Sequence, residues 1–299
     1  MIYNISKDFN RCKIMRMPFF SLILYIARIP QDIMFKLTKI PKDIKLKKYT
    51  LDNKLNVYIF EPKNNKGDIP CLFYFHGGAF GYKAASHHKK LSCIYAKEVG
   101  IKVVLVDYSL LPRNTYPKAL EDVLYTYKWI YKKHKELQID KNRIAVGGDS
   151  AGAVLATYLC NSKEVDKLCA QMLVYPVTDA NMETESMKKY DDTPMWNSKN
   201  NKRMWSMYLK NTNIIQRKEA SPMQASLSND IPNTYIEVAE FDCLHDEGIN
   251  YFKRLLDRGV KVELNETYGT VHGYDVILNS KITKESVSKR IKFLKENMF

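Results

Sequence analysis

Cysteine is scarce in this sequence, and its spacing is not that of a metal site or a disulfide framework. Six cysteines occur in 299 residues, and none forms a C-x-x-C pair. Cys71 and Cys169 lie in apolar runs typical of strands, so we expect buried free thiols. No group of histidines, cysteines and acids has metal-ligand spacing. The sequence therefore predicts no metal or other cofactor, and a reducing, cytoplasmic environment.

Acidic residues are fewer than basic ones. The chain has 33 Asp and Glu against 47 Lys and Arg, which gives a formal net charge of +14. An excess of positive charge can favour binding to nucleic acids or to anionic membranes. The lysines are spread along the chain, however, and no helix-turn-helix, zinc-finger or RNA-binding signature accompanies them. We therefore expect no nucleic-acid partner and ascribe the charge to a general use of lysine.

Long apolar runs are also absent, and the nearest approach is the stretch over residues 17–27. It is too short to span a bilayer as a helix. A signal peptide is disfavoured because Pro18 opens the run and Arg28-Ile29-Pro30 stands where a small-residue cleavage site belongs. We interpret residues 1–42 as a helical cap over the functional site. A signal peptide and peripheral membrane contact are the alternatives.

From Asp43 onward, strand patterns alternate with helical ones. Apolar runs predict strands at 54–60, 71–75, 101–106, 143–147, 171–175, 234–239 and 260–266. Periodic segments between them predict helices at 86–98, from 117, and at 151–159, 246–256 and 284–297. The alternation predicts an α/β domain over residues 43–299, with a mostly parallel sheet and helices on both faces. Residues 178–233 lack strand alternation, and we expect a helical cap insertion there.

Five short motifs follow the predicted strands. In chain order they are His76-Gly77-Gly78-Ala79-Phe80, Gly148-Asp149-Ser150-Ala151-Gly152, Tyr175-Pro176, Phe241-Asp242-Cys243-Leu244-His245-Asp246-Glu247-Gly248 and His272-Gly273. They contain a nucleophile, an acid and a base in the order Ser…Asp…His, which the α/β-hydrolase fold uses. Other folds carry the same triad in other orders, so the order itself is informative.

Ser150 is the expected nucleophile, because G-x-S-x-G stands between an apolar strand and a helix. Small neighbours are needed where a serine sits on a sharp, strained turn. The glycines after His76 expose backbone N–H groups, which can stabilise the oxyanion that develops on an attacked carbonyl. The alternatives are an inert glycine-rich turn at Ser150 and a plain tight turn after His76.

His272 is the expected base and Asp242 the acid that orients it, since each follows a predicted strand. The other histidines are rivals for the base, and His245 is the most serious because it lies near the acid: His76, His87, His88, His134 and His245. Three acids are rivals for Asp242: Glu240, Asp246 and Glu247. The last two fall in the first turn of a predicted helix, where acids commonly have a capping role.

These motifs resemble those of the hormone-sensitive-lipase family of α/β-hydrolases, which includes microbial carboxylesterases and arylacetamide deacetylase. The resemblance covers about residues 43–299 and extends to Asp107-Tyr108-Ser109-Leu110-Leu111-Pro112 and Ser221-Pro222. It implies an oxyanion hole from the N–H groups of Gly77, Gly78 and Ala151. It also implies a cap built from the N-terminal segment and the insertion. Three departures are Ala79 in place of a third glycine, Ala153 where a further glycine is common after the nucleophile turn, and His245 in place of a usual arginine.

The resemblance implies a serine carboxylesterase that cleaves short- to medium-chain acyl esters through an acyl-enzyme. An amidase or deacetylase and an acyltransferase would use the same site. A catalytically silent small-molecule-binding scaffold is another alternative, which the complete Ser150, Asp242 and His272 set disfavours. The expected partner is a small-molecule ester. A homodimer and a lipase acting at a membrane interface stay open.

Overall fold

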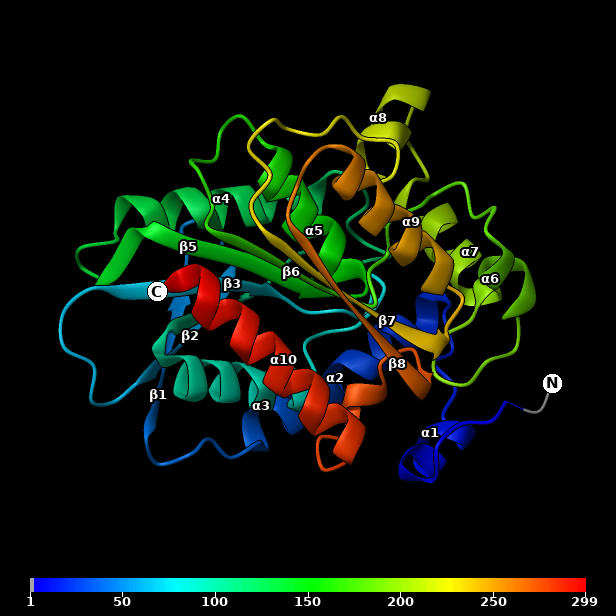
Figure 1. Cartoon of the computed structure of the whole chain (residues 1–299), viewed down its shortest axis with the longest axis horizontal. Helices are drawn as coiled ribbons and strands as arrows, with labels where there is room; N and C mark the ends of the chain where they lie inside the picture. The colour runs from blue at the N-terminus through cyan, green and yellow to red at the C-terminus, as the bar shows by residue number, and fades with distance from the viewer. Residues whose placement is uncertain (1–2) are drawn as a thin grey trace.

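One twisted, eight-stranded sheet runs through the protein (Figure 1), for which the computed structural model describes residues 3–299. From one edge to the other the strands are β1 (Ile44–Thr50), β2 (Asn56–Pro62), β4 (Lys102–Asp107), β3 (Ile69–Phe75), β5 (Ile139–Asp149), β6 (Ala170–Val174), β7 (Thr234–Phe241) and β8 (Val262–Val271). β2 is antiparallel to both β1 and β4, and every other neighbouring pair is parallel. The predicted mostly parallel α/β sheet is confirmed.

Helices cover both faces of the sheet, as predicted (Figure 1). One face packs against α4 (Lys118–Lys132), α5 (Ala151–Asn161) and α9 (His245–Asp257). The other packs against α3 (Ser86–Tyr95), the π-helical turn Ala96–Gly100 and α10 (Lys281–Met298). β3 shows why the central strands are apolar throughout. Its Phe73 belongs to the first core and its Leu72 and Tyr74 to the second, so neither face meets water.

The edge strand β1 lies outside the predicted strands. Lys45, Lys47 and Lys48 interrupt its apolar pattern, and Ile44 is its one buried side chain. Lysines on an edge strand discourage pairing with another chain. A strand of this kind is specified by its pairing with β2 more than by its own sequence.

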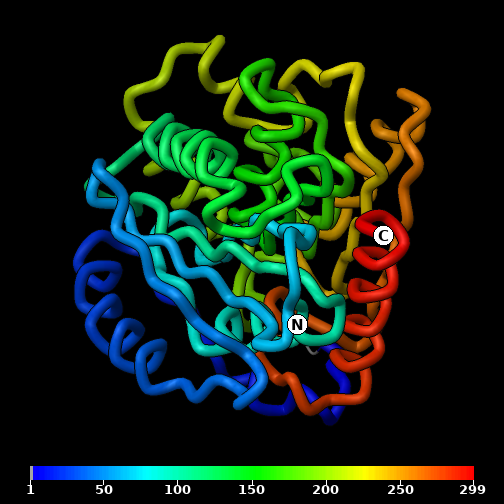
Figure 2. Tube along the Cα trace, turned by 90° about the vertical axis from the view of Figure 1, so that its left-hand side faces the viewer, coloured from blue at the N-terminus to red at the C-terminus, as the bar shows by residue number. Residues whose placement is uncertain are grey.

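Two segments outside the sheet lie against each other. The first holds a 3-10 turn (Lys7–Phe9), α1 (Asn10–Ile14) and α2 (Ser21–Leu37); the second, between β6 and β7, holds α6 (Glu185–Lys189), α7 (Ser198–Tyr208) and α8 (Ile214–Glu219). The Met195 N–H donates to the Met15 carbonyl at 2.9 Å, and the Phe19 and Trp196 rings lie 5.5 Å apart. Figure 2 shows α2 along the outer margin of the molecule. No helix within residues 3–299 is long and apolar enough to cross a membrane.

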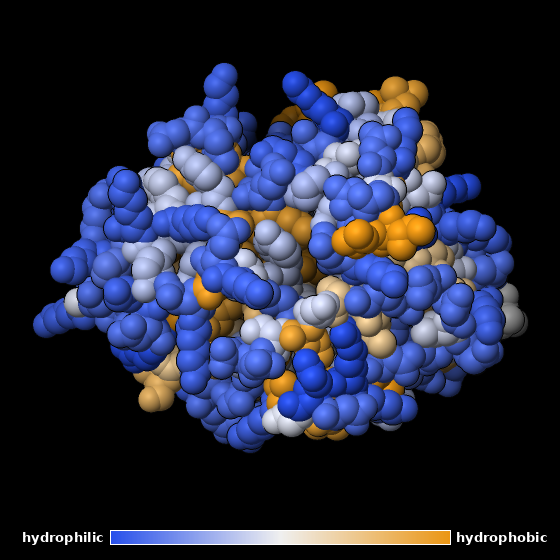
Figure 3. All heavy atoms as spheres, turned by 90° about the horizontal axis from the view of Figure 1, so that it is seen from above, coloured by the Kyte–Doolittle hydropathy of each residue, from blue (hydrophilic) through white to orange (hydrophobic). Residues whose placement is uncertain are grey.

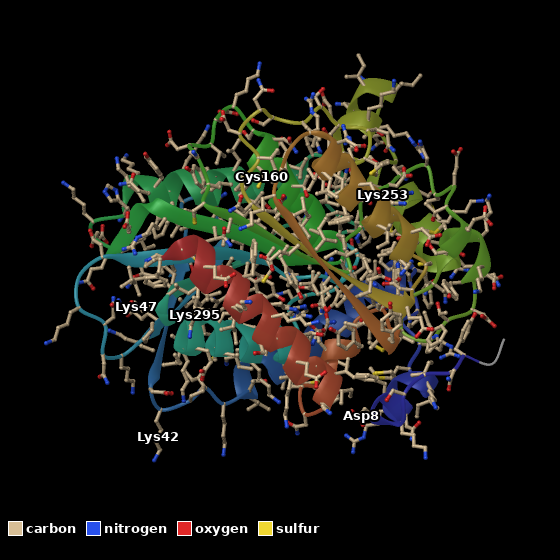
Figure 4. The ribbon with its side chains drawn as sticks, viewed as in Figure 1. Asp8, Lys42, Lys47, Cys160, Lys253 and Lys295 are labelled. Carbon is tan, nitrogen blue, oxygen red and sulfur yellow. The ribbon has the colours of Figure 1, made fainter. Side chains whose placement is uncertain are left out.

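The six cysteines are free thiols. Cys71 is buried as expected, and Cys160 lies inside on α5 (Figure 4). Cys169 is partly exposed, so the expectation of burial was wrong for this residue.

Candidate active site

Ser150 lies on a tight turn between β5 and α5. Its backbone has φ +53° and ψ −121°, a strained conformation for a residue with a side chain. The two glycines of the motif are required because a side chain at either position would clash with neighbouring backbone atoms. A Cβ on Gly148 would lie 2.3 Å from the backbone of Gly152, and a Cβ on Gly152 would lie 2.0 Å from the Phe75 carbonyl oxygen. The strand, the serine and the helix therefore pack as closely as their backbones permit.

Ser150, His272 and Asp242 are brought together in one hydrogen-bonded chain. His272 Nε2 lies 2.9 Å from Ser150 Oγ, and His272 Nδ1 lies 2.7 Å from Asp242 Oδ2. The other carboxylate oxygen of Asp242 accepts the Leu244 N–H at 2.9 Å. All three catalytic candidates are buried. With Nδ1–H donating to the carboxylate, Nε2 is free to accept the serine proton.

The strands deliver these side chains to one edge of the sheet. Asp242 directly follows β7, and β8 continues to Val271, so His272 is the next residue. We expected this last strand to end near Glu266, and it is five residues longer. Gly273 follows with φ +66°, which turns the chain away from the sheet.

A tyrosine and a buried ion cluster support the histidine loop. The Tyr175 ring lies 4.8 Å from the His272 ring, and its hydroxyl donates to Asp275 at 2.7 Å. Arg290, on α10, donates to Asp275 at 2.9 Å and to Glu237. Burial lowers the pKa of Arg290, but Glu237 outweighs it and holds that pKa well above its usual value. The arginine therefore stays charged and ties the loop after His272 to α10.

Of the predicted oxyanion donors, Gly77 has its N–H already engaged. It donates to Asp149 Oδ2 at 3.0 Å, so the expectation that Gly77 binds an oxyanion does not hold in this arrangement. Gly78 lines the cavity beside Ser150, with φ +107°. Ala151 opens α5, and the first N–H groups of a helix have no acceptor within it. Of the three predicted donors, Gly78 and Ala151 are thus the two whose N–H groups could bind an oxyanion in this arrangement.

Asp149 is a functional residue that the motif contained but the sequence analysis gave no role. Besides Gly77, its carboxylate accepts the Tyr74 hydroxyl at 2.9 Å and pairs with His88 Nε2 at 3.1 Å. Burial raises its pKa, but His88, the nearby His87 and the Tyr74 hydrogen bond together hold it below the usual value. A carboxylate directly after the uncharged, buried run over residues 144–148 was the available signal, because a buried charge needs partners.

His87, His88 and Asp149 are also the group that could hold a metal ion, with one ligand atom each within 4.8 Å of one another. His88 does not suit that role as it stands. Its Nδ1 accepts the Ala85 N–H at 2.8 Å, which leaves the proton on Nε2, pointing at Asp149. A metal would have to displace this proton and break the pair.

The rival histidines lie in other environments. His245 pairs with Asp246 at 2.8 Å. His76 hydrogen-bonds the Gly77 carbonyl at 2.7 Å and stacks on Tyr108, and burial lowers its pKa to about 3. His134, in the turn after α4, hydrogen-bonds the Tyr131 carbonyl at 2.9 Å. His245, His76 and His134 do not make the hydrogen bond to Ser150 that His272 makes.

Two of the three rival acids bind the segment that follows β6, and the third, Glu240, accepts the Gly269 N–H at 2.6 Å. Glu247 is buried and accepts the backbone N–H groups of Thr178 and Asp179 at 2.6 and 3.1 Å. Asp246 accepts the Ser186 N–H at 2.7 Å. The expected capping role was therefore incomplete: both acids tie α9 to the segment that follows β6.

A cavity of about 340 Å³ opens above Ser150 and His272. Its lining is mostly apolar. The two segments outside the sheet together contribute four methionines to it: Met15, Met17 and Met34 from the first, and Met195 from the second. Of the aromatic residues in the predicted cap, Trp196 lines the cavity and its ring lies 6.4 Å from that of His272. An apolar cavity that ends at a serine and an imidazole suits an apolar ligand with one polar, reactive group.

Comparison with known proteins identifies the fold and the relatives of this chain. A family model of the alpha/beta hydrolase fold matches residues 72–276. The ethyl acetate hydrolase of Pseudomonas putida is 30% identical over 208 residues, which cover 68% of this chain and 65% of that protein. The carboxylesterase NlhH of Mycobacterium tuberculosis is 30% identical over 225 residues, covering 73% and 70%. The crystal structure of a thermostable esterase from Pseudomonas putida ECU1011 has a TM-score of 0.87 and 26% identity, and the match covers 99% and 98% of the two chains.

Proposed function

This chain belongs to the hormone-sensitive-lipase-like family of α/β-hydrolases, and on that basis we propose that it hydrolyses carboxylic esters with Ser150 as its nucleophile. The observation that carries the proposal is the continuous chain from Ser150 Oγ through His272 to Asp242, at 2.9 and 2.7 Å. A nucleophile, a base and an orienting acid in hydrogen-bond reach are the parts that covalent acyl transfer needs.

The reaction proceeds in two halves. His272 Nε2 removes the Ser150 proton as Oγ attacks the ester carbonyl, and Asp242 stabilises the imidazolium that forms. The N–H groups of Gly78 and Ala151 stabilise the oxyanion of the tetrahedral intermediate. The intermediate expels the alcohol, which takes the proton from His272. Water, activated by the same imidazole, then hydrolyses the acyl-enzyme and restores Ser150.

The substrate class follows from the cavity and from the names of relatives. Two relatives are called ethyl acetate hydrolase and carboxylesterase, which suits a short to medium acyl group. The methionine-rich lining accepts an apolar chain. In this proposal residues 1–42 and 178–233 act as the cap that encloses the acyl group.

Hydrolysis of p-nitrophenyl esters from acetate to laurate tests the proposal. We expect turnover by the wild type and its loss in Ser150→Ala, with Ser288→Ala, an exposed serine on α10, as the matched control. Intact-mass analysis after treatment with a fluorophosphonate should show one adduct on the wild type and none on Ser150→Ala. A folded wild type that cleaves no ester and takes no adduct would refute the proposal and favour a silent scaffold; adduct formation with amide but no ester turnover would favour an amidase.

A further inference from the structure

Exposed apolar side chains gather in one part of this protein. Of the 17 large apolar residues that are exposed within residues 3–299, eleven lie between Ile14 and Ile40. The face shown in Figure 3, by contrast, is mostly hydrophilic and carries apolar atoms in small groups. Scattered apolar residues need no explanation, but a concentrated set marks an interaction surface.

The set centres on the outer side of α2. Five residues at helical spacing form one stripe along it: Leu22, Ile26, Ile29, Ile33 and Leu37. They are 51% to 76% exposed. The opposite side of α2 packs inward through Leu24 and Phe35, which are buried. The stripe therefore faces away from the protein, and Figure 2 shows the chain leaving that side of α2 uncovered.

The charges around the stripe are mostly positive. Seven exposed basic residues precede or follow the stripe in the sequence between residues 7 and 42: Lys7, Arg11, Lys13, Arg16, Lys36, Lys39 and Lys42. Lys42 points away from the fold (Figure 4). The acids in the same stretch are fewer and bound elsewhere. Asp32 pairs with Lys83 and Asp43 with Lys97, and Asp8 accepts the Lys281 N–H. Two copies of this face would bring like charges together, which disfavours a dimer through it.

We propose that the outer stripe of α2 and its flanking lysines and arginines dock this protein on an anionic lipid surface. An apolar helix face rimmed by basic residues lies in the plane of the membrane interface, with its apolar side in the headgroup region. Met15, Met17 and Met34, from the same segment, line the cavity above Ser150. The segment that docks thus also forms part of the cavity wall, and in this proposal esters with apolar acyl groups reach the cavity from the lipid phase.

Vesicle flotation tests the docking separately from ester hydrolysis. The wild type should float with vesicles of phosphatidylglycerol and phosphatidylcholine, less with phosphatidylcholine alone, and less again in high salt. The triple variant Ile26→Ser/Ile29→Ser/Ile33→Ser should bind at least about tenfold more weakly, because binding scales with buried apolar area. The matched control is Ile214→Ser/Ile215→Ser, which changes exposed isoleucines on α8 that are 76% and 68% exposed.

None of the three substituted isoleucines lines the cavity, so hydrolysis of soluble p-nitrophenyl acetate by the triple variant should match the wild type and verify its fold. A wild type that stays with the soluble fraction for every vesicle, or a triple variant that floats as well as the wild type, would overturn the proposal. Light scattering that shows a dimer for the wild type and a monomer for the triple variant, without flotation, would instead assign the stripe to a second copy. Flotation by a protein without esterase activity would refute the proposed function alone.

Discussion

Replacing Asp149 with asparagine tests how the oxyanion loop is held. The carboxylate accepts three hydrogen bonds: Tyr74 at Oδ1, and Gly77 and His88 at Oδ2. An amide has one acceptor oxygen, and its best orientation keeps that oxygen at Gly77 and His88 and turns the NH2 toward the Tyr74 hydroxyl. All three charge-assisted hydrogen bonds become neutral ones. At about 1 kcal/mol lost for each, we expect Asp149→Asn to lower the free energy of unfolding by about 3 kcal/mol.

The effect on turnover follows from the anchor on Gly77. When the Gly77 N–H is held less tightly, the adjacent Gly78 N–H moves relative to Ser150, and a displacement near 1 Å costs about a hundredfold in rate. We therefore expect kcat of Asp149→Asn for p-nitrophenyl acetate to fall about ten- to a hundredfold.

The matched control for this prediction is Tyr74→Phe, which removes only the Oδ1 contact. It should cost about 1 kcal/mol of stability and keep kcat within about twofold of the wild type. Denaturant unfolding and steady-state kinetics measure both quantities. Wild-type kcat in Asp149→Asn, or an equal loss of kcat in Tyr74→Phe, would refute the reasoning.

Three further outcomes are expected. Gly152→Ala should yield no folded, active protein in expression and circular-dichroism assays, because its Cβ would lie 2.0 Å from a backbone oxygen. Arg290→Met leaves Glu237 and Asp275 buried without their cation and should lower the free energy of unfolding by about 3–5 kcal/mol in denaturant titrations. The folded protein keeps His76 neutral down to a pKa of about 3, whereas the unfolded chain protonates it near 6.5. Stability should therefore fall as pH drops between those values, by up to about 1.4 kcal/mol per pH unit, and His76→Gln should flatten this slope.

Local sequence was enough to predict most strands and the residues that meet at the strand ends. Ser150, Asp242 and His272 each come at or just after the end of a strand, and parallel strands bring such positions to one edge. The engagement of the Gly77 N–H could not be predicted in this way. Its acceptor, Asp149, lies 72 residues away, and their contact depends on how β3 and β5 pair.

The sequence also did not predict which side of α2 packs against the rest of the protein, for a similar reason. The run over residues 17–27 is apolar on every side of a helix, so its pattern does not identify the side that packs. Burial of Leu24 and exposure of Ile26 follow from the contacts that α2 makes with the rest of the chain. A charged edge strand such as β1 is likewise specified by its neighbour.

The four methionines around the cavity have a consequence for oxidising conditions. A thioether is flexible and polarisable, so these walls adjust to ligands of different shape without rebuilding the backbone. The same sulfur atoms accept oxygen, and each sulfoxide places a polar group where an apolar chain would lie. Met34, at 60% exposed, is open to solvent peroxide, whereas Met195 is shielded at 7%. Peroxide damage to this cavity would therefore start at its rim on α2, and methionine sulfoxide reductases could reverse it there.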